Sequence, residues 1–475
     1  MAEVLWQWDE LVAAAQGRAE GAPATPITGL SIDTRSLAPG DVFVALKDAR
    51  DGHEFVGAAF KAGAAAALVS QAYARSGADG ALIRVADPLR ALEAVGRAAR
   101  VRTDARIVAV TGSVGKTSTK EALRLCLSVM GPTHASEKSY NNHWGVPLTL
   151  ARMPKDAKFA VLEIGMNHPG EITPLAGMVR PHVAVITTVE PVHLGQFASV
   201  ADIAEAKAEI LQGLVPGGAA VLPRDNPHFA LLRDGAKAAG ARIVTFGYHE
   251  EADFRAIQVD IGHRGSSVIA GHGSQRFPYR VGAPGEHYVK NSLAVLAALS
   301  AVGADIMRCA PALLKLTPPA GRGARVHLAA PGGPILLIDE SYNANPASVR
   351  AALAAMATTP REDHPRRIAV LGDMLELGEA SADLHRGLKE AVDAAGVDLV
   401  FACGPMMRLL VDDLAPSKRG AWAASSAELT QALLDAVHPG DVVMIKGSLG
   451  SRMALLVAAM QGRFGSERPQ GRLGG

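Results

Sequence analysis

The chain is 475 residues long, which is too long for one hydrophobic core, so we expect roughly two to four domains. Its formal net charge of +1, from 48 basic and 47 acidic residues, gives no argument for binding nucleic acid or a membrane surface. The sequence shows no secretory leader and no apolar run near the roughly 20 residues of a membrane span, so we expect a cytoplasmic protein without membrane insertion. Three widely spaced cysteines in apolar surroundings predict buried thiols rather than a disulfide or metal framework: Cys126, Cys309 and Cys403.

The first block of the sequence alternates short apolar runs with one helical segment. Residues 41–46, 66–69 and 81–85 are typical of buried strands. Residues 55–63 have helical spacing and end on glycine, and a long alanine-rich helix is predicted over 88–101. The sequence therefore predicts a small α/β domain over residues 1–86.

The second block repeats this alternation on a larger scale, with helical segments between strands. This pattern is typical of a mostly parallel sheet with right-handed crossovers, and it predicts a central domain over residues 87–318. Consecutive prolines within residues 316–323 end the preceding helix and predict a linker. The expected strands are residues 106–110, 159–164, 183–188, 219–222 and 242–246.

The third block predicts a Rossmann-like domain over residues 319–465. The fold class is therefore α/β with three domains, followed by a tail over 466–475 that we expect to be disordered because it has little to bury. The expected strands of this block are residues 334–338, 367–371, 399–402 and 441–445.

A glycine loop lies between the first strand of the second block and the following helix. Its backbone N–H groups would cradle phosphate, Lys116 would reach the β- and γ-phosphates, and the Thr117 hydroxyl is placed for Mg²⁺. The general motif has four residues between its glycines, whereas this loop has only Ser113 and Val114. A Gly/Ser turn is the alternative, but the strand, the helix and the Lys-Thr pair favour an ATP site. The loop comprises Gly112, Ser113, Val114, Gly115, Lys116, Thr117 and Ser118.

Three ionisable residues follow the glycine loop in the sequence. Glu163 lies near the end of an apolar strand, where a carboxylate needs a cation such as Mg²⁺ or a partner in an ion pair. His193 follows the next strand and should lie on the same edge of the sheet, although a loop histidine is more often a surface residue. Lys207 lies in an amphipathic helix, where the residues alone favour a solvated lysine.

These segments together resemble the Mur ligases of bacterial peptidoglycan synthesis, over nearly the whole chain. The short glycine loop is similar to the ATP loop of that family. The resemblance implies that Glu163 and His193 hold magnesium, and that CO₂ carbamylates Lys207 into a further metal ligand beside Thr117. It therefore implies ATP and Mg²⁺, and it reverses the interpretation of Lys207 as a solvated residue.

The resemblance also implies residues that bind the substrates. Asn291 matches an asparagine near the adenine, Arg322 an arginine on the nucleotide phosphates, and Asp339 an acidic residue that binds the nucleotide from the third domain. Residues 339–346, Asp-Glu-Ser-Tyr-Asn-Ala-Asn-Pro, resemble a family signature except at Glu340. The implied residues for the uridine diphosphate are Ser31, Asp33, Thr34 and Arg35, and the other implied substrate residues are Asn141, Asn142, Tyr342 and Asn345.

The segments at 339–346 and 141–148 resemble the family member that joins D-alanyl-D-alanine to UDP-N-acetylmuramoyl-tripeptide through an acyl phosphate. We therefore expect an ATP-dependent peptide ligase with these two partners, acting as a monomer. In this reading the first domain binds the UDP-linked substrate. One alternative is a ligase that adds diaminopimelate or lysine. Another is a nucleotide-dependent regulatory module that hydrolyses ATP slowly.

Overall fold

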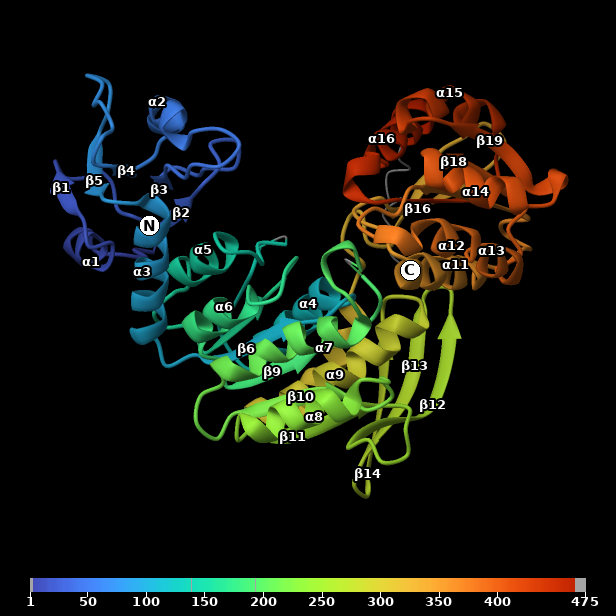
Figure 1. Cartoon of the computed structure of the whole chain (residues 1–475), viewed down its shortest axis with the longest axis horizontal. Coiled ribbons are helices and arrows are strands. Elements are labelled where there is room, and N and C mark those ends of the chain that lie inside the picture. Colours follow the sequence, from blue (N-terminus) through green and yellow to red (C-terminus); the bar gives the residue numbers. More distant parts are fainter. Residues whose placement is uncertain (1–2, 138, 193, 466–475) are drawn as a thin grey trace, which may run out of the picture.

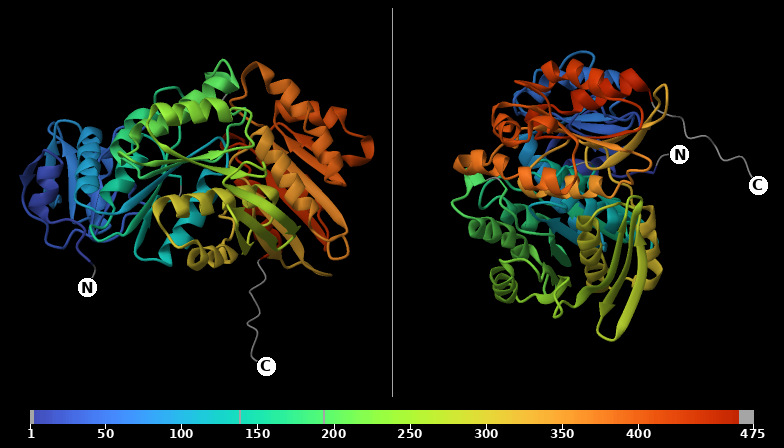
Figure 2. Two further views of the ribbon diagram at one scale, coloured as in Figure 1. Left: turned by 90° about the horizontal axis from the view of Figure 1, so that it is seen from below. Right: turned by 90° about the vertical axis from the view of Figure 1, so that its right-hand side faces the viewer.

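A computed structural model gives the fold of residues 3–137, 139–192 and 194–465. It contains three sheets that follow one another along the chain, each in its own α/β domain. In Figure 1 the N-terminal domain (blue) and the C-terminal domain (orange to red) lie on opposite sides of the central domain, and Figure 2 shows the three in a row. The predicted three-domain α/β architecture is confirmed, whereas the predicted disordered tail lies outside the described residues.

The N-terminal domain has a five-stranded sheet in the order β1-β5-β4-β3-β2, parallel except for the edge strand β1. The three predicted strands are its central members, and the predicted helix begins as a 3₁₀ turn. The strands are β1 (Arg18–Glu20), β2 (Gly29–Ser31), β3 (Asp41–Val44), β4 (Ala66–Ser70) and β5 (Ala81–Val85), and the helices are α1 (Trp8–Ala14), η1 (Gly52–Phe55) and α2 (Val56–Lys61).

Helix α3 (Pro88–Val101) joins the N-terminal domain to the central domain. It begins where the Asp87 carboxylate accepts hydrogen bonds from the backbone N–H groups of Leu89 (2.8 Å) and Arg90 (3.1 Å). One apolar core unites α3 with the first sheet and with Leu148 and Ala151 of the central domain. The N-terminal core is thus completed by residues of the next domain.

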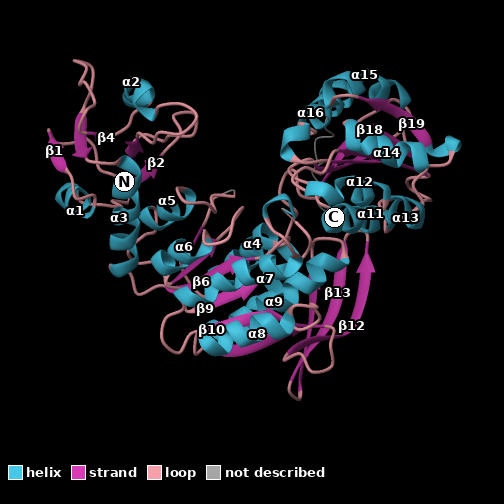
Figure 3. Ribbon diagram, in the orientation of Figure 1, coloured by secondary structure: helices cyan, strands magenta, loops and turns pink. Residues whose placement is uncertain are grey.

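The central domain has a nine-stranded sheet in the order β14-β13-β12-β11-β10-β9-β6-β8-β7. The strands from β7 to β12 are parallel, whereas β12, β13 and β14 pair with one another in antiparallel fashion. Helices cover both faces, as Figure 3 shows. The strands are β6 (Arg106–Thr111), β7 (Thr133–Ala135), β8 (Phe159–Glu163), β9 (Val183–Ile186), β10 (Ala219–Pro223), β11 (Arg242–Gly247), β12 (Phe254–Gly262), β13 (Gly265–His272) and β14 (Gln275–Val281). The helices are α4 (Lys116–Ser128), α5 (Gly145–Ala151), α6 (Ile172–Val179), η2 (Leu194–Gln196), α7 (Val200–Ala208), η3 (Glu209–Gly213), α8 (Phe229–Ala238), α9 (Glu286–Val302), α10 (Ile306–Cys309) and η4 (Ala310–Lys315).

The parallel part of this sheet determines where the site lies. Strands β8, β6 and β9 are neighbours and run in the same direction, so their carboxyl ends meet at one edge. The glycine loop follows β6, Glu163 is the last residue of β8, and Thr187 directly follows β9. Ligands of open α/β sheets bind at such an edge.

The C-terminal domain has a six-stranded sheet in the order β15-β16-β20-β17-β18-β19, with β15 antiparallel at one edge. No described helix has the length and apolar character of a membrane span. The strands are β15 (Ala324–Leu328), β16 (Ile335–Glu340), β17 (Arg366–Gly372), β18 (Leu399–Cys403), β19 (Arg419–Ala423) and β20 (Asp441–Lys446). The helices are α11 (Pro346–Ala357), η5 (Gly378–Ala380), α12 (Ser381–Arg386), α13 (Lys389–Ala394), α14 (Pro405–Asp413), η6 (Pro416–Lys418), α15 (Ser426–Ala436), η7 (Leu449–Ser451) and α16 (Ala454–Phe464).

All three cysteines are buried and free, as the sequence predicts.

Candidate active site

The glycine loop is closely packed against its neighbours. Gly112 (φ +151°) has no room for a Cβ atom because the Thr187 hydroxyl occupies that space, and Gly115 (φ +83°) faces the Asn291 amide. The Thr187 hydroxyl donates to the Val114 carbonyl at 2.6 Å. The loop is therefore held in shape by the segment after β9 and by α9.

Lys116 is the first residue of α4 and folds back over the loop, where its Nζ donates to the Gly112 carbonyl at 2.6 Å. Burial lowers the pKa of Lys116; the Glu163 carboxylate opposes this effect and the Arg322 guanidinium adds to it. The amine is thus close to a carboxylate from β8 and to an arginine from the domain linker. A cation in this position can contact the β- and γ-phosphates of a nucleotide.

Glu163 is only 1% exposed, yet its carboxylate has two hydrogen-bond donors. The Thr117 hydroxyl donates to Oε2 at 2.9 Å, and the Asn141 side-chain amide donates to Oε1 at 2.7 Å. The backbone N–H of Glu163 donates to the Ser136 hydroxyl at 3.1 Å. Two of the predicted metal ligands, Thr117 and Glu163, are therefore in direct contact, and both offer the oxygen atoms that Mg²⁺ prefers.

Lys207 lies in the last turn of α7 and is 3% exposed, so the interpretation of a solvated lysine is wrong. Its amine makes no hydrogen bond or ion pair with a described residue. Burial lowers the pKa of Lys207 well below its ordinary value, and the nearby Lys116 ammonium lowers it further. Both effects favour the uncharged amine, which is the nucleophilic form of a lysine.

His193 lies outside the described residues, but the segment that leads to it is tied to the glycine loop. The Ser113 hydroxyl donates to the Glu190 carbonyl at 3.0 Å, and the Ser113 N–H donates to the Thr188 carbonyl at 2.9 Å. Among the described residues, no group of three or more His, Cys, Asp and Glu side chains forms a metal site.

Asn291 and Arg322 approach the loop from two further elements. The Asn291 amide donates to the Ser118 hydroxyl at 3.0 Å from within α9. Arg322 extends from the linker to the Ser139 hydroxyl of the central domain (3.2 Å), and its guanidinium lies 4.1 Å from the ring centroid of Tyr342. The structure thus brings residues of the central domain, the linker and the C-terminal domain together.

Asp339 is buried at the end of β16 and organises the linker. Its carboxylate accepts hydrogen bonds from the N–H of Gly321 (2.9 Å) and from the N–H (3.1 Å) and hydroxyl (2.6 Å) of Ser341. These bonds place Arg322 beside Tyr342. The predicted nucleotide contact of Asp339 stays a prediction.

Two family models match this chain. The Mur ligase middle domain matches residues 110–299, and the Mur ligase glutamate ligase domain matches residues 321–449. Together they cover more than half of the chain.

The chain belongs to the Mur ligase family.

Two curated relatives of this Mur ligase share the name UDP-N-acetylmuramoyl-tripeptide–D-alanyl-D-alanine ligase. The protein from Bacillus subtilis (strain 168) is 32% identical over 440 residues, which are 91% of this chain and 93% of that protein. The protein from Escherichia coli (strain K12) is 34% identical over 450 residues, which are 94% and 96%.

Solved structures of Mur ligases superimpose on the chain. MurF from Acinetobacter baumannii is 30% identical with a TM-score of 0.82, and the match covers 97% of this chain and all of that one (100%). MurF from Thermotoga maritima, crystallised in complex with ADP, is 26% identical with a TM-score of 0.74, and the match covers 92% and 97%.

The predicted uridine-diphosphate residues of this Mur ligase form one turn after β2. The Ser31 hydroxyl donates to the Asp33 carbonyl at 3.1 Å, and Asp33 pairs with the exposed Arg35 at 2.7 Å. Thr34 lies within the same turn. The Tyr140 side chain is close enough to affect the pKa of Arg35, which is raised chiefly by Asp33. The turn therefore lies near the segment that carries Asn141.

Two predicted substrate residues cap helices. Asn142 accepts a hydrogen bond from the N–H of Gly145 (2.9 Å) at the start of α5. Asn345 accepts one from the N–H of Ser348 (2.8 Å) at the start of α11. Tyr342, by contrast, is 38% exposed. These hydrogen bonds fix the backbone of residues 141–148 and 339–346, so both signature segments stabilise the fold of this Mur ligase.

Sequence reasoning missed Lys120 and Ser136. Lys120 is 0% exposed and its amine donates to the Ser136 carbonyl at 2.6 Å, while the Ser136 hydroxyl holds the backbone of Glu163. The signal was the spacing, because Lys120 lies one helical turn after Lys116 on the buried face of α4.

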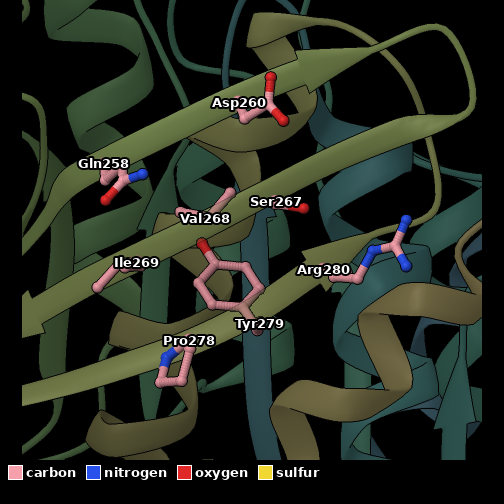
Figure 4. Close-up of a pocket in the computed structure, with 8 residues that line it drawn as sticks. All are labelled: Gln258, Asp260, Ser267, Val268, Ile269, Pro278, Tyr279 and Arg280. Atoms are coloured by element: carbon pink, nitrogen blue, oxygen red, sulfur yellow. The ribbon is translucent and has the colours of Figure 1, made fainter.

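A separate hollow of about 340 Å³ lies on strands β12, β13 and β14. Figure 4 shows its polar residues, among them Asp260 and Arg280. None of the predicted site residues lines it, so it belongs to a different part of this Mur ligase.

Proposed function

We propose that this chain joins D-alanyl-D-alanine to UDP-N-acetylmuramoyl-tripeptide at the expense of ATP. The observation that carries this proposal is the buried contact between Glu163 and Thr117 beside Lys116, in a chain whose relatives with this activity in their names match more than nine-tenths of its length. The contact supports phosphoryl transfer, and the relatives' names supply the substrates.

We assign one binding task to each domain. Residues 1–86 bind the UDP-linked substrate through Ser31, Asp33, Thr34 and Arg35. Residues 87–318 bind ATP through the glycine loop and Asn291, with Arg322 reaching the phosphates from the linker. Residues 319–465 bring D-alanyl-D-alanine through Tyr342 and Asn345. We also propose that the protein acts as a monomer in the cytoplasm.

The first chemical step makes a good leaving group. An oxygen of the tripeptide's terminal carboxylate attacks the γ-phosphorus of ATP, the bond to the β-phosphate oxygen breaks, and ADP leaves. Lys116 stabilises the charge on the transferred phosphoryl group, and the backbone N–H groups of the loop bind the phosphates. The product is an acyl phosphate.

The second step forms the peptide bond. The uncharged amine of D-alanyl-D-alanine attacks the acyl carbon, the carbon–oxygen bond to phosphate breaks, and the amine releases a proton to water. Inorganic phosphate leaves. Closure of the C-terminal domain would bring the amine into position and exclude the water that otherwise hydrolyses the acyl phosphate.

The residues near Glu163 fit a magnesium site. Thr117 and Glu163 offer oxygen atoms in direct contact, and we propose His193 and a carbamylated Lys207 as further ligands. The buried amine of Lys207 supports this because an uncharged lysine can add CO₂. Bound Mg²⁺ would neutralise charge on the phosphates of ATP.

Phosphate release tests the proposed reaction. We expect release from ATP with UDP-N-acetylmuramoyl-tripeptide to depend on added D-alanyl-D-alanine. If only a free diamino acid with the shorter UDP-linked precursor stimulates release, the chain is the diaminopimelate- or lysine-adding ligase. ATP hydrolysis that no amine stimulates would instead indicate a regulatory module.

Replacing Lys207 with alanine tests the proposed carbamate. We expect turnover to be largely abolished, because the variant has no amine to modify, and short carboxylates such as acetate to restore part of it. Full turnover of the variant without added carboxylate would contradict the carbamate role.

A further inference from the structure

Glu209 follows Lys207 by two residues and forms an unusually complete set of hydrogen bonds. Its carboxylate accepts from the N–H groups of Gly170 (2.6 Å), Ile172 (3.1 Å) and Thr173 (3.0 Å), and from the Thr173 hydroxyl (3.1 Å). These donors belong to the first turn of α6 and the residues just before it. Glu209 thus caps a helix that begins 37 residues earlier in the chain.

The cap is supplied from another element because α6 lacks one of its own. The residue at its N-terminal boundary, Glu171, makes no capping bond with its side chain. The free N–H groups and the positive end of the helix dipole therefore favour the Glu209 carboxylate. As a result, the end of α7 is fastened to the segment that follows β8.

This fastening joins α7, which carries Lys207, to α6, which follows the strand that ends at Glu163. Glu163 ends β8, and the chain then runs through residues 164–171 into α6. Lys207 lies in the last turn of α7, two residues before Glu209 opens η3. Lys116 lowers the pKa of Lys207, and the Glu163 carboxylate raises the pKa of Lys116 against the effect of burial. The three side chains are therefore near one another.

We propose that Glu209 is a positioning residue for Lys207: by fastening the end of α7 to the start of α6, it keeps the Lys207 amine buried beside Lys116, where CO₂ can modify it. This inference rests on the carbamylation of Lys207 in the proposed function. In this proposal Glu209 acts through Lys207 and has no direct role toward substrate or metal.

The chemistry explains why position matters. The lone pair of the uncharged amine attacks the carbon of CO₂, a nitrogen–carbon bond forms, one carbon–oxygen π pair becomes a carboxylate charge, and the nitrogen releases a proton to water. If α7 loosens, the Lys207 side chain is no longer held in its buried position. The carbamate also loses its cationic neighbour, Lys116.

Carbamate occupancy can be measured directly. The purified full-length chain is equilibrated with ¹³C-bicarbonate at a series of concentrations, and the carbamate carbon is observed by ¹³C NMR. Lys207→Ala identifies the signal, since it should lack it. For Glu209→Ala we expect half-maximal occupancy to need about 10–100 times more bicarbonate, by analogy with the loss of metal affinity when a residue that orients a metal ligand is replaced.

Two further variants separate positioning from stability. Glu209→Gln keeps one acceptor oxygen and should give an intermediate bicarbonate requirement, and it replaces the alanine variant if that variant does not fold. Asp87→Ala removes a comparable carboxylate cap, from α3, and should lower the melting temperature without changing the bicarbonate requirement.

The outcomes are distinct. A normal bicarbonate requirement in both Glu209 variants would overturn the proposal and leave Glu209 as a helix cap only, with the carbamate of the proposed function intact. If the unmodified chain gives no carbamate signal that Lys207→Ala removes, both the carbamate and the positioning role are overturned, while phosphate release still tests the ligase activity separately.

Discussion

At the scale of single residues, the site depends on a buried carboxylate with a full set of partners. Glu163 receives hydrogen bonds from Thr117 and Asn141, and its backbone is held by Ser136. Thr117 would have to turn its hydroxyl from the carboxylate toward a bound metal. Asn141 would then be the donor that continues to orient Glu163.

Asn141→Ala removes the hydrogen bond to Glu163 Oε1. We expect turnover to fall about 10–100-fold, and the Mg²⁺ concentration for half-maximal activity to rise, because the carboxylate is no longer oriented. Steady-state assays at several Mg²⁺ concentrations measure both quantities. Its neighbour provides the control: Asn142→Ala removes the cap of α5 and should lower the melting temperature without raising the Mg²⁺ requirement. Equal Mg²⁺ requirements in both variants would argue against this role of Asn141.

At the scale of elements, one histidine joins two central strands. His182 lies just before β9, and its Nδ1 accepts a hydrogen bond from the N–H of Ile107 in β6 (3.0 Å). Burial lowers the pKa of His182 from 6.5 to about 4, with help from Arg106 and Arg100. The ring therefore stays neutral in the folded chain while it gains a proton in the unfolded chain.

This difference predicts acid sensitivity in a defined range. As the pH falls from 6.5 to about 4, the unfolded chain binds a proton that the folded chain does not, so the free energy of unfolding falls. The slope from this group is at most about 1.4 kcal/mol per pH unit. His182→Asn keeps an acceptor without the titration, so we expect a shallower decline in urea unfolding experiments over this range. An unchanged slope would show that His182 is not responsible.

The elements also show what could be predicted from the sequence. Strands β3–β6, β8–β11, β16–β18 and β20 are buried apolar runs, and each was predicted within two residues at either end. The antiparallel strands β12, β13 and β14 were not, because many of their residues are exposed and no continuous apolar run marks them. The glycine loop follows from local sequence, whereas the burial of Lys207 depends on α7 packing against the rest of the domain. No local pattern encodes that packing.

At the scale of the whole molecule, the linker connects the C-terminal domain to the central domain beside the proposed nucleotide site. The Asp339 carboxylate accepts hydrogen bonds from Gly321 and Ser341. Arg322, which follows Gly321, donates to the Ser139 hydroxyl of the central domain. The C-terminal domain also meets the central domain where Gly195 of η2 donates to the Glu376 carbonyl at 3.2 Å. In the proposed closure of the C-terminal domain, this linker is the segment that would guide the movement.

Asp339→Ala releases the linker while leaving the glycine loop unchanged. We expect kcat to fall about 100-fold, because misplacing the acceptor domain by about 1 Å suffices for such a loss. Small-angle X-ray scattering should show the unmodified chain becoming more compact with ADP and the UDP-linked substrate, and the variant failing to do so. If the variant still becomes compact but binds ADP more weakly, Asp339 acts by direct nucleotide contact instead.

The core shared between the first two domains bears on how the chain folds during synthesis. The Trp6 indole donates to the Ala151 carbonyl at 2.8 Å, and Leu148 packs into the same core. The ribosome completes the first sheet at Val85 long before it makes α5. Part of the apolar face of the nascent N-terminal domain therefore stays exposed until residue 151 leaves the ribosome. During this interval we expect that face to be a binding site for a chaperone.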